Sequence, residues 1–296
     1  MNSLLRHDRW ITEILSRTIA FAQSQPSLGA AVKAGFSGTQ WKFLIANASP
    51  SQQKMILDVI LDPRANSNSI KFVLGQLQWS SDMLDKLKPV NLDELHELDG
   101  IWGLYTIVAT TETPEGPCTS YHYSGSSTAN RTYENTFSGM ARRVALHKSL
   151  LELPPDELQR LRRQRTNVLY VHEVCTRPNT TYKIYRRASF PIIDDDAKLC
   201  LQFKQLLVLF EHIDIVYQGN LSHCLDDSQH YGPFSVDSLH RIIHETRPTD
   251  MPTPQWKGAN RALPISQNSL RSLPNPAYLA LRSVLESHLM STKGIT

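Results

Sequence analysis

The stretch that decides the fold reads "GLYTIVATTETPEGPCTSYHYSGSST" and runs from Gly103 to Thr128. Two runs of β-branched and aromatic residues flank a break rich in proline and glycine, "TETPEGPC". This composition predicts two strands joined as a β-hairpin. Tyr105 lies near the start of the first strand and Tyr123 near the end of the second. We therefore expect their phenols to face the same cleft if the register suits.

The segments around this hairpin predict a mixed fold. Residues 1–98 repeat apolar residues at steps of three and four, as in "WITEILSRTIAFA" and "SQQKMILDVILD", which indicates helices. After the hairpin, "SGMARRVALHKSLL" and "DELQRLRRQR" predict helices, whereas "NVLYVHEVC" and "TYKIYRRASF" predict strands. The segment "AKLCLQFKQLLVLFEHIDIVYQG" predicts a long buried helix that ends at Gly219. This order is typical of an α+β protein built as a small α/β sandwich.

Three regions follow from these changes in pattern. A helical N-terminal region spans 1–98 and the sandwich domain spans 99–220. A C-terminal extension, 221–296, contains many prolines and reads as loops until a last predicted helix, "AYLALRSVLESHLM".

Composition excludes some classes of protein. The chain has 296 residues and a net charge of +3. Its hydrophobic content, 41%, is ordinary for a globular protein. Its four cysteines are far apart and form no CxxC pair, so neither a disulfide scaffold nor a zinc ribbon is expected. The longest apolar stretch, 199–217, is too polar for a membrane helix. The N-terminal segment has the arginines and serines typical of a transit peptide, but Asp8 and Glu13 interrupt this pattern.

Positive charge is concentrated in the middle of the chain. Residues 136–190 hold eleven Arg and Lys against four Asp and Glu, a net +7, so the remainder sums to −4. This asymmetry favours a face that binds a polyanion, although a solvated helix surface fits the charge equally well. The candidate phosphate contacts are Arg142, Lys148, Arg160, Arg162, Arg163 and Arg165.

Three further polar residues have chemistry of their own. Arg143 and His147 are four positions apart on a predicted helix, so a guanidinium and an imidazole share one face. Glu211 interrupts a very apolar helix, and burying a carboxylate costs several kcal/mol unless it meets a cation or donors. A divalent metal is one such cation. A core salt bridge or exposure to solvent would also explain Glu211.

The ordered set of these residues resembles the GIY-YIG nuclease superfamily. The first element is Gly103-Leu104-Tyr105 and the second is Tyr123-Ser124-Gly125. Arg143 with His147 matches the helical pair of the family, and Glu211 matches its metal-binding acid. The resemblance covers about residues 101–220. The two tyrosines are 18 positions apart, longer than the family hairpin, and this excess falls in a predicted loop, where added length costs little.

The resemblance implies a sandwich with a central antiparallel sheet and a site asparagine. Asn260, in "PQWKGANRALP", is the preferred candidate, with 221–253 as an insertion, and Asn220 is the other. The implied activity is that of a metal-dependent endonuclease. Glu211 would hold Mg²⁺ or Mn²⁺, and Tyr105 would orient or deprotonate water, helped by His147 or Tyr123. Arg143 would neutralise charge on the phosphate, and Tyr123 and Asn260 would position the reacting groups.

The implied partner is nucleic acid, with DNA preferred, in an intracellular compartment such as the nucleus; a mitochondrial location stays open, as does the oligomeric state. Two alternatives remain: an inactive module on the same scaffold that binds nucleic acid or protein, and an unrelated α/β protein. His240 and His244 have the spacing of zinc ligands, but no third ligand completes a recognisable pattern.

Overall fold

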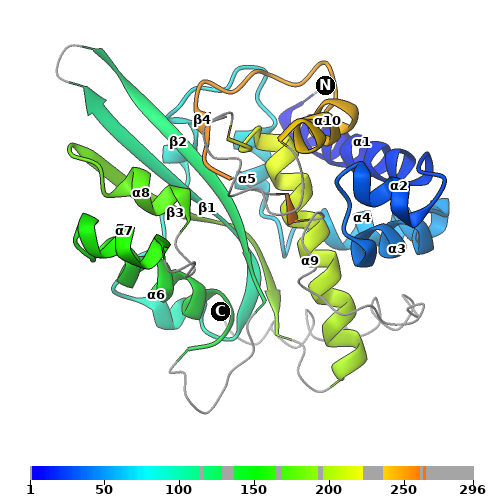
Figure 1. Cartoon of the computed structure of the whole chain (residues 1–296), viewed down its shortest axis with the longest axis horizontal. Helices are drawn as coiled ribbons and strands as arrows, with labels where there is room; N and C mark the ends of the chain where they lie inside the picture. Colours follow the sequence, from blue (N-terminus) through cyan, green and yellow to red (C-terminus); the bar gives the residue numbers. More distant parts are fainter. Residues whose placement is uncertain are drawn as a thin grey trace.

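A four-stranded sheet forms the centre of the fold (Figure 1). The computed structural model describes residues 2–113, 116–128, 137–163, 169–192, 196–222, 236–260 and 263–264. The strand order is β3-β1-β2-β4, with β1 (Ile101–Thr113), β2 (Gly116–Ser127), β3 (Thr180–Pro191) and β4 (Lys257–Gly258). β1 pairs antiparallel with β2 and β3, whereas β4 adds a short parallel pairing to β2. The α+β class is confirmed, and the sheet is mixed.

The N-terminal region is helical, as predicted. It contains α1 (Ser3–Gln23), α2 (Leu28–Lys33), α3 (Gly38–Ala46), α4 (Pro50–Ile60), α5 (Asn68–Leu74) and the 3-10 turns η1 (Met83–Lys86) and η2 (Leu95–Leu98). Each α-helix follows an asparagine or serine whose side chain accepts the backbone N–H three residues further on, a common N-cap. These caps are Asn2, Ser27, Ser37, Ser49 and Ser67.

Helices cover both faces of the sheet (Figure 1). On one face lie α6 (Gly139–Leu151), α7 (Pro155–Arg163) and α8 (Tyr170–Cys175); on the other lies α9 (Ala197–Gln218), with α1 and α10 (Val236–Thr246) beyond it. Because side chains alternate along a strand, Tyr105 and Ile107 pack with α6, whereas Trp102 and Leu104 pack with α9. The helices α1 to α5 share the α9 core.

A β-bulge interrupts the pairing of β1 with β3. Leu104 pairs with Ala188 and Tyr105 with Arg186, so Arg187 is an extra residue in β3. The bulge turns Arg187 and Ala188 toward the same layer, where Ala188 joins the α9 core and Arg187 forms an ion pair with Asp214 of α9. An arginine in an exposed-looking "YRRAS" run is thus buried.

Three secondary-structure predictions were wrong. Residues 170–175 form α8 and no strand, because the apolar residues Val171, Val174 and Cys175 follow a helical spacing and are buried on one face. The hairpin strands extend to Thr113 and from Gly116, through most of the predicted loop. The extension after 220 contains α10 and β4 in addition to loops. The last predicted helix lies outside the described residues.

The helices of the described part of the chain include none with the length and apolar character that a membrane span requires.

Candidate active site at the outer edge of β2

Two tyrosines of the hairpin lie side by side on the α6 face of the sheet. The ring centroids of Tyr105 and Tyr123 are 6.4 Å apart, and both side chains are buried. Tyr105 stands opposite Gly125 in the pairing of β1 with β2. A Cβ at position 125 would lie 2.5 Å from the Tyr105 hydroxyl oxygen and 2.9 Å from Tyr123 Cε1. The Tyr105 ring therefore crosses from β1 over Gly125, toward the outer edge of β2.

Gly125→Ala is expected to displace the Tyr105 hydroxyl, because real Cβ contacts are never that short. We expect a loss of about 1–3 kcal/mol in the free energy of unfolding, as for other overpacked sites, measured by urea denaturation. Any activity that depends on Tyr105 should fall with it. Gly29→Ala is the matched control, because the space around Gly29 is open and alanine is a better helix former. Unchanged stability in Gly125→Ala would contradict this placement of the phenol.

Helix α6 presents a cation and an imidazole to the same hydroxyl. Arg143 Nε donates a hydrogen bond to Tyr105 Oη over 3.2 Å, and His147 Nε2 lies 2.7 Å from that oxygen. The Arg143 side chain also hydrogen-bonds Tyr123, and the two phenols raise the pKa of Arg143. Burial raises the pKa of Tyr105, and Arg143 opposes this effect. Burial raises the pKa of Tyr123 well above its ordinary value. Burial and the neighbouring Arg143 and His172 hold the pKa of His147 well below its usual range.

Glu211 binds the outer edge of β2 at Ser126, the residue after Gly125. It projects from α9, on the opposite face of the sheet from α6. Its Oε2 accepts a hydrogen bond of 2.5 Å from Ser126 Oγ, and its carboxylate also accepts the Ser126 backbone N–H. Among the described residues, β4 pairs with β2 only at Tyr121 and His122, so no described strand covers the edge at Ser126.

The carboxylate of Glu211 shares one electrostatic environment with the phenols and Arg143. Its charge raises the pKa values of Tyr105 and Tyr123, and Arg143 in turn lowers the pKa of Glu211. Burial dominates, however, and with Asp214 it raises the pKa of Glu211 to about 7. Glu211 and Arg143 are partly exposed, so solvent reaches the charged side of the site and not the phenol rings. Four of the five residues that the motif predicted thus contact one another, and Glu211 interacts with three of them through its charge without a direct hydrogen bond to any of them.

Both candidate asparagines hold the strand between Tyr123 and Gly125. Asn260 Oδ1 accepts the Ser124 N–H over 2.9 Å, and Asn260 Nδ2 donates to the Ser124 carbonyl over 2.7 Å. Asn220 Nδ2 donates to Ser124 Oγ over 2.9 Å. Both asparagines are buried, and these bonds assign them to positioning β2.

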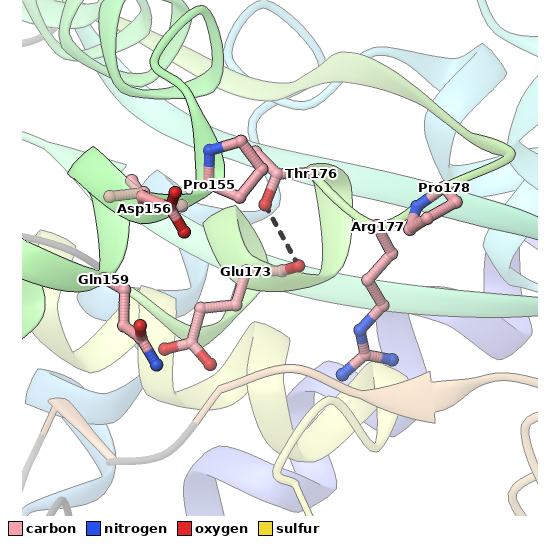
Figure 2. Close-up of a pocket in the computed structure, with 8 residues that line it drawn as sticks. Pro155, Asp156, Gln159, Glu173, Thr176, Arg177 and Pro178 are labelled. Carbon is pink, nitrogen blue, oxygen red and sulfur yellow. Dashed lines mark hydrogen bonds between the residues drawn. The ribbon is translucent and has the colours of Figure 1, made fainter.

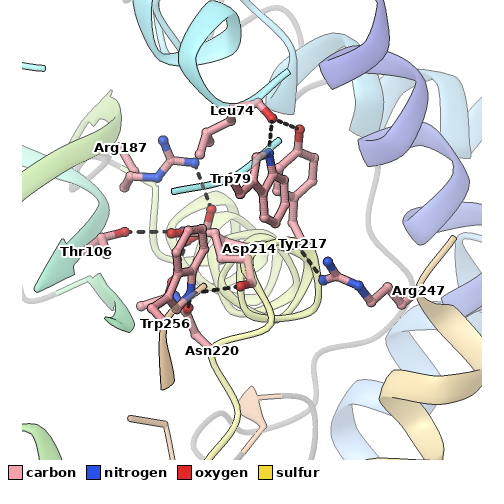
Figure 3. A network of polar contacts seen from close by, with 11 residues as sticks. Leu74, Trp79, Thr106, Arg187, Asp214, Tyr217, Asn220, Arg247 and Trp256 are labelled. Carbon is pink, nitrogen blue, oxygen red and sulfur yellow. Dashed lines mark hydrogen bonds and ion pairs between the residues drawn. The ribbon is translucent and has the colours of Figure 1, made fainter. Parts of the chain in front are cut away.

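A buried polar network surrounds Asp214 of α9 and includes Arg187 of β3 (Figure 3). Asp214 accepts hydrogen bonds from Ser124 Oγ (2.7 Å), Gln218 Nε2 (2.6 Å) and Arg187 Nη2 (3.0 Å). The side chains of Arg187 and Asp214 are each only 4% exposed, so this ion pair is part of the core. Nothing in the local sequence pattern marks it, because its members come from three distant elements.

The predicted phosphate contacts are scattered. Lys148 pairs with Asp93 at 3.0 Å and Arg160 with Glu157 at 2.5 Å, while Arg142 is partly exposed on α6. Arg165 and the side chains of Arg162 and Arg163 lie outside the described residues.

Two further cations lie against Tyr121. Arg177 and Lys257 stand over the Tyr121 ring, 5.3 and 5.7 Å from its centroid. Tyr121 precedes Tyr123 by two residues and so faces the same side of the sheet. Arg177 also donates to the hydroxyls of Tyr121 (3.2 Å) and Tyr170 (3.3 Å). No carboxylate in the described part of the chain forms an ion pair with Arg177 or Lys257.

A pocket opens beside Arg177, between α7 and α8 (Figure 2). Its volume is about 370 Å³. Arg177, Glu173 and Gln159 point to the same side of this pocket, so it offers both donors and acceptors.

Other candidates gain less support. His240 and His244 lie on α10, and the described residues hold no group of three His, Cys, Asp or Glu side chains that could bind a metal ion. Comparison of the chain with protein-family models, curated proteins and solved structures found no significant match. The interpretation of the site therefore depends on its own geometry.

Proposed function

We propose that the protein is a metal-dependent endonuclease of the GIY-YIG type that hydrolyses phosphodiester bonds in nucleic acid. The observation that carries the proposal is the contact of two phenols with a guanidinium and an imidazole beside β2, together with a carboxylate bound at the edge of the same strand. These groups come from β1, β2, α6 and α9 and are up to 106 positions apart in the chain, between Tyr105 and Glu211. Local sequence therefore does not explain their proximity.

Glu211 fits a hard divalent cation. It is a partly exposed carboxylate that accepts hydrogen bonds from Ser126 and forms no ion pair with a described residue. Mg²⁺ is typically held by one or two carboxylates, water and substrate phosphate, so a single protein ligand suffices. Bound here, Mg²⁺ or Mn²⁺ would supply Lewis-acid stabilisation of charge on the phosphate oxygens.

The remaining residues would orient the substrate and move a proton. Arg143 bears a fixed positive charge at the partly exposed side, where it can neutralise charge that develops on the phosphoryl oxygens. The Tyr105 hydroxyl, held by Arg143 and His147, would orient the attacking water or, when ionised, accept its proton. Because Tyr105 is buried in the free protein, this water would have to enter with the substrate. Tyr123 hydrogen-bonds Arg143 and would keep the guanidinium in place.

Arg177 and Lys257 are expected to bind a substrate phosphate beside the cleavage site. Both are cations on the Tyr121 side of the same face. The double change Arg177→Ala and Lys257→Ala should weaken nucleic-acid binding about 10- to 100-fold and lower the slope of log affinity against log salt by about two. Fluorescence anisotropy with a DNA oligonucleotide in EDTA measures both.

The matched control removes two exposed cations from the helical region, Lys33 of α2 and Lys42 of α3. If that control weakens binding as much as the double variant does, the binding is not localised at Tyr121.

Plasmid nicking with Mg²⁺, with Mn²⁺ and with EDTA tests the activity. Cleavage that requires the divalent ion supports the endonuclease. The alternative is an inactive binding module, and the burial of Tyr105, Tyr123 and His147 is compatible with it. Binding that is sensitive to salt, with no cleavage under any condition, would favour that module. Absence of both would reject nucleic acid as the partner.

A further inference from the structure

We propose that His172 is a positioning residue that fixes the tautomer of His147, so that His147 donates a hydrogen bond to Tyr105 and cannot act as its base. The mechanistic part of this inference rests on the proposed function. The hydrogen-bond order does not, since it follows from the structure of the free protein.

A continuous chain of hydrogen bonds joins the backbone of α8 to the Tyr105 hydroxyl. The Leu169 N–H donates to His172 Nδ1 over 3.0 Å. His172 Nε2 lies 2.7 Å from His147 Nδ1, and His147 Nε2 lies 2.7 Å from Tyr105 Oη. His147 and His172 are each 1% exposed, so water does not compete for these atoms.

The first bond sets the direction of the whole chain, because a backbone N–H can only donate. His172 Nδ1 must then be unprotonated, so the proton of the neutral ring lies on Nε2 and is donated to His147 Nδ1. His147 in turn carries its proton on Nε2 and donates it to Tyr105 Oη. Burial lowers the pKa of His172 to about 4 and that of His147 well below its usual range, which agrees with two neutral rings.

This order makes Tyr105 Oη the acceptor of two hydrogen bonds. Arg143 has donors only, so its Nε–H also points its proton at the oxygen. Burial keeps the pKa of Tyr105 above its ordinary value and the charge of Glu211 adds to this effect, whereas the charge and hydrogen bond of Arg143 and the hydrogen bond of Tyr123 favour the ionised form. An oxygen surrounded by donors is suited to a phenolate and leaves its own proton to point away from α6.

With this hydrogen-bond order, each proton in the hydrolysis step has a defined donor and acceptor. Water that enters with the substrate gives a proton to the Tyr105 phenolate while its oxygen forms the bond to phosphorus. The bond from phosphorus to the leaving oxygen breaks with its electron pair, and that oxygen takes a proton from solvent. The Tyr105 phenol, which is buried in the free protein, returns its proton to water that enters once the product has left. His147 takes no proton in this step, because its Nε2 already carries one.

Nitrogen NMR of the free protein, labelled with ¹⁵N-histidine, tests the hydrogen-bond order without any assay of cleavage. We expect both His147 and His172 as neutral Nε2–H tautomers at pH 7, with signals assigned by the variants His147→Gln and His172→Phe. A His147 signal typical of the Nδ1–H tautomer or of the imidazolium would overturn the proposal, whether or not the protein is a nuclease.

The kinetic test uses His172→Phe, which keeps the volume of the ring and removes its hydrogen bonds. We expect the rate of Mg²⁺-dependent nicking to fall about 10²-fold and its pH profile to shift, with DNA affinity in EDTA unchanged. The matched control is His122→Phe, since His122 is also fully buried and stacks on Trp256 on the other face. A folded His172→Phe protein with the wild-type rate and pH profile would refute the positioning role. If His172→Phe unfolds, the NMR result decides alone.

Discussion

A Glu211→Gln protein is expected to lose at least about 10³-fold in Mg²⁺-dependent cleavage and yet to be more stable than the wild type above pH 7. Glutamine keeps an oxygen that can accept the two Ser126 hydrogen bonds, so the position of α9 against β2 is retained. What disappears is the negative charge, which is the part that a divalent cation requires.

The gain in stability follows from proton linkage. Glu211 has a pKa of about 7 in the folded protein without metal, against an ordinary value of 4.5. Between these two values the folded state holds a proton that the unfolded state has lost, so the free energy of unfolding falls as the pH rises. Above pH 7 the destabilisation is complete and amounts to about 2 kcal/mol, after a reduction for the partial exposure of the side chain. Glutamine does not titrate and escapes this loss.

Thermal unfolding in EDTA at pH 4.5 and pH 8, together with nicking rates, checks both effects. The variant and the wild type should unfold alike at the lower pH and differ at the higher one. Glu245→Gln, an exposed change on α10, serves as the control and should alter neither property. A Glu211→Gln protein that still cuts DNA with Mg²⁺ would refute the metal assignment.

An Arg187→Met protein is expected to lose about 3–5 kcal/mol in the free energy of unfolding, the typical cost of leaving a buried charge without its partner. Asp214 would keep the hydrogen bonds from Ser124 and Gln218 but no cation, at 4% exposure. The bulge in β3 holds Arg187 at this place, so no neighbouring side chain can take over its role.

The double variant Arg187→Met with Asp214→Asn distinguishes a lost ion pair from a packing defect. Removing both charges should recover most of the loss, because no uncompensated charge remains and the amide still accepts from Ser124. Lys183→Met is the exposed counterpart on the same strand. Its pair with Asp85, at 2.8 Å, is about half exposed on both sides, so we expect less than about 1 kcal/mol. Urea denaturation measures the free energy of unfolding of each variant. Equal losses in Arg187→Met and Lys183→Met would contradict the burial of the charge on Asp214.

Local pattern was enough to predict the parts of the site that depend on neighbours in the chain. Alternation placed Tyr105 and Tyr123 on one face once the hairpin register was known, and the four-residue step placed Arg143 beside His147. The helix of Glu211 was predicted from its apolar run and from Gly219, which has a φ of +65° at the helix end.

The missing parts depend on contacts between distant elements. His172 lies in a six-residue helix whose short apolar run also fits a strand, so its role could not be predicted. The Glu211 carboxylate lies at the outer edge of β2, in a place that a longer β4 would cover. How far β4 extends depends on tertiary structure. The sequence favoured Asn260 over Asn220 because of its Gly-x-Asn context, and in the structure both asparagines bind Ser124.

The short β4 has a consequence for solubility. Beyond His122, no strand in the described part of the chain pairs with the outer backbone groups of β2. Rows of free N–H and carbonyl groups recruit strands from other molecules and lead to aggregation. Here the Asn260 side chain forms hydrogen bonds with the backbone N–H and carbonyl of Ser124. The Glu211 carboxylate accepts the backbone N–H of Ser126. The side chains that would serve chemistry thus also keep one copy of the chain from joining its sheet to that of another.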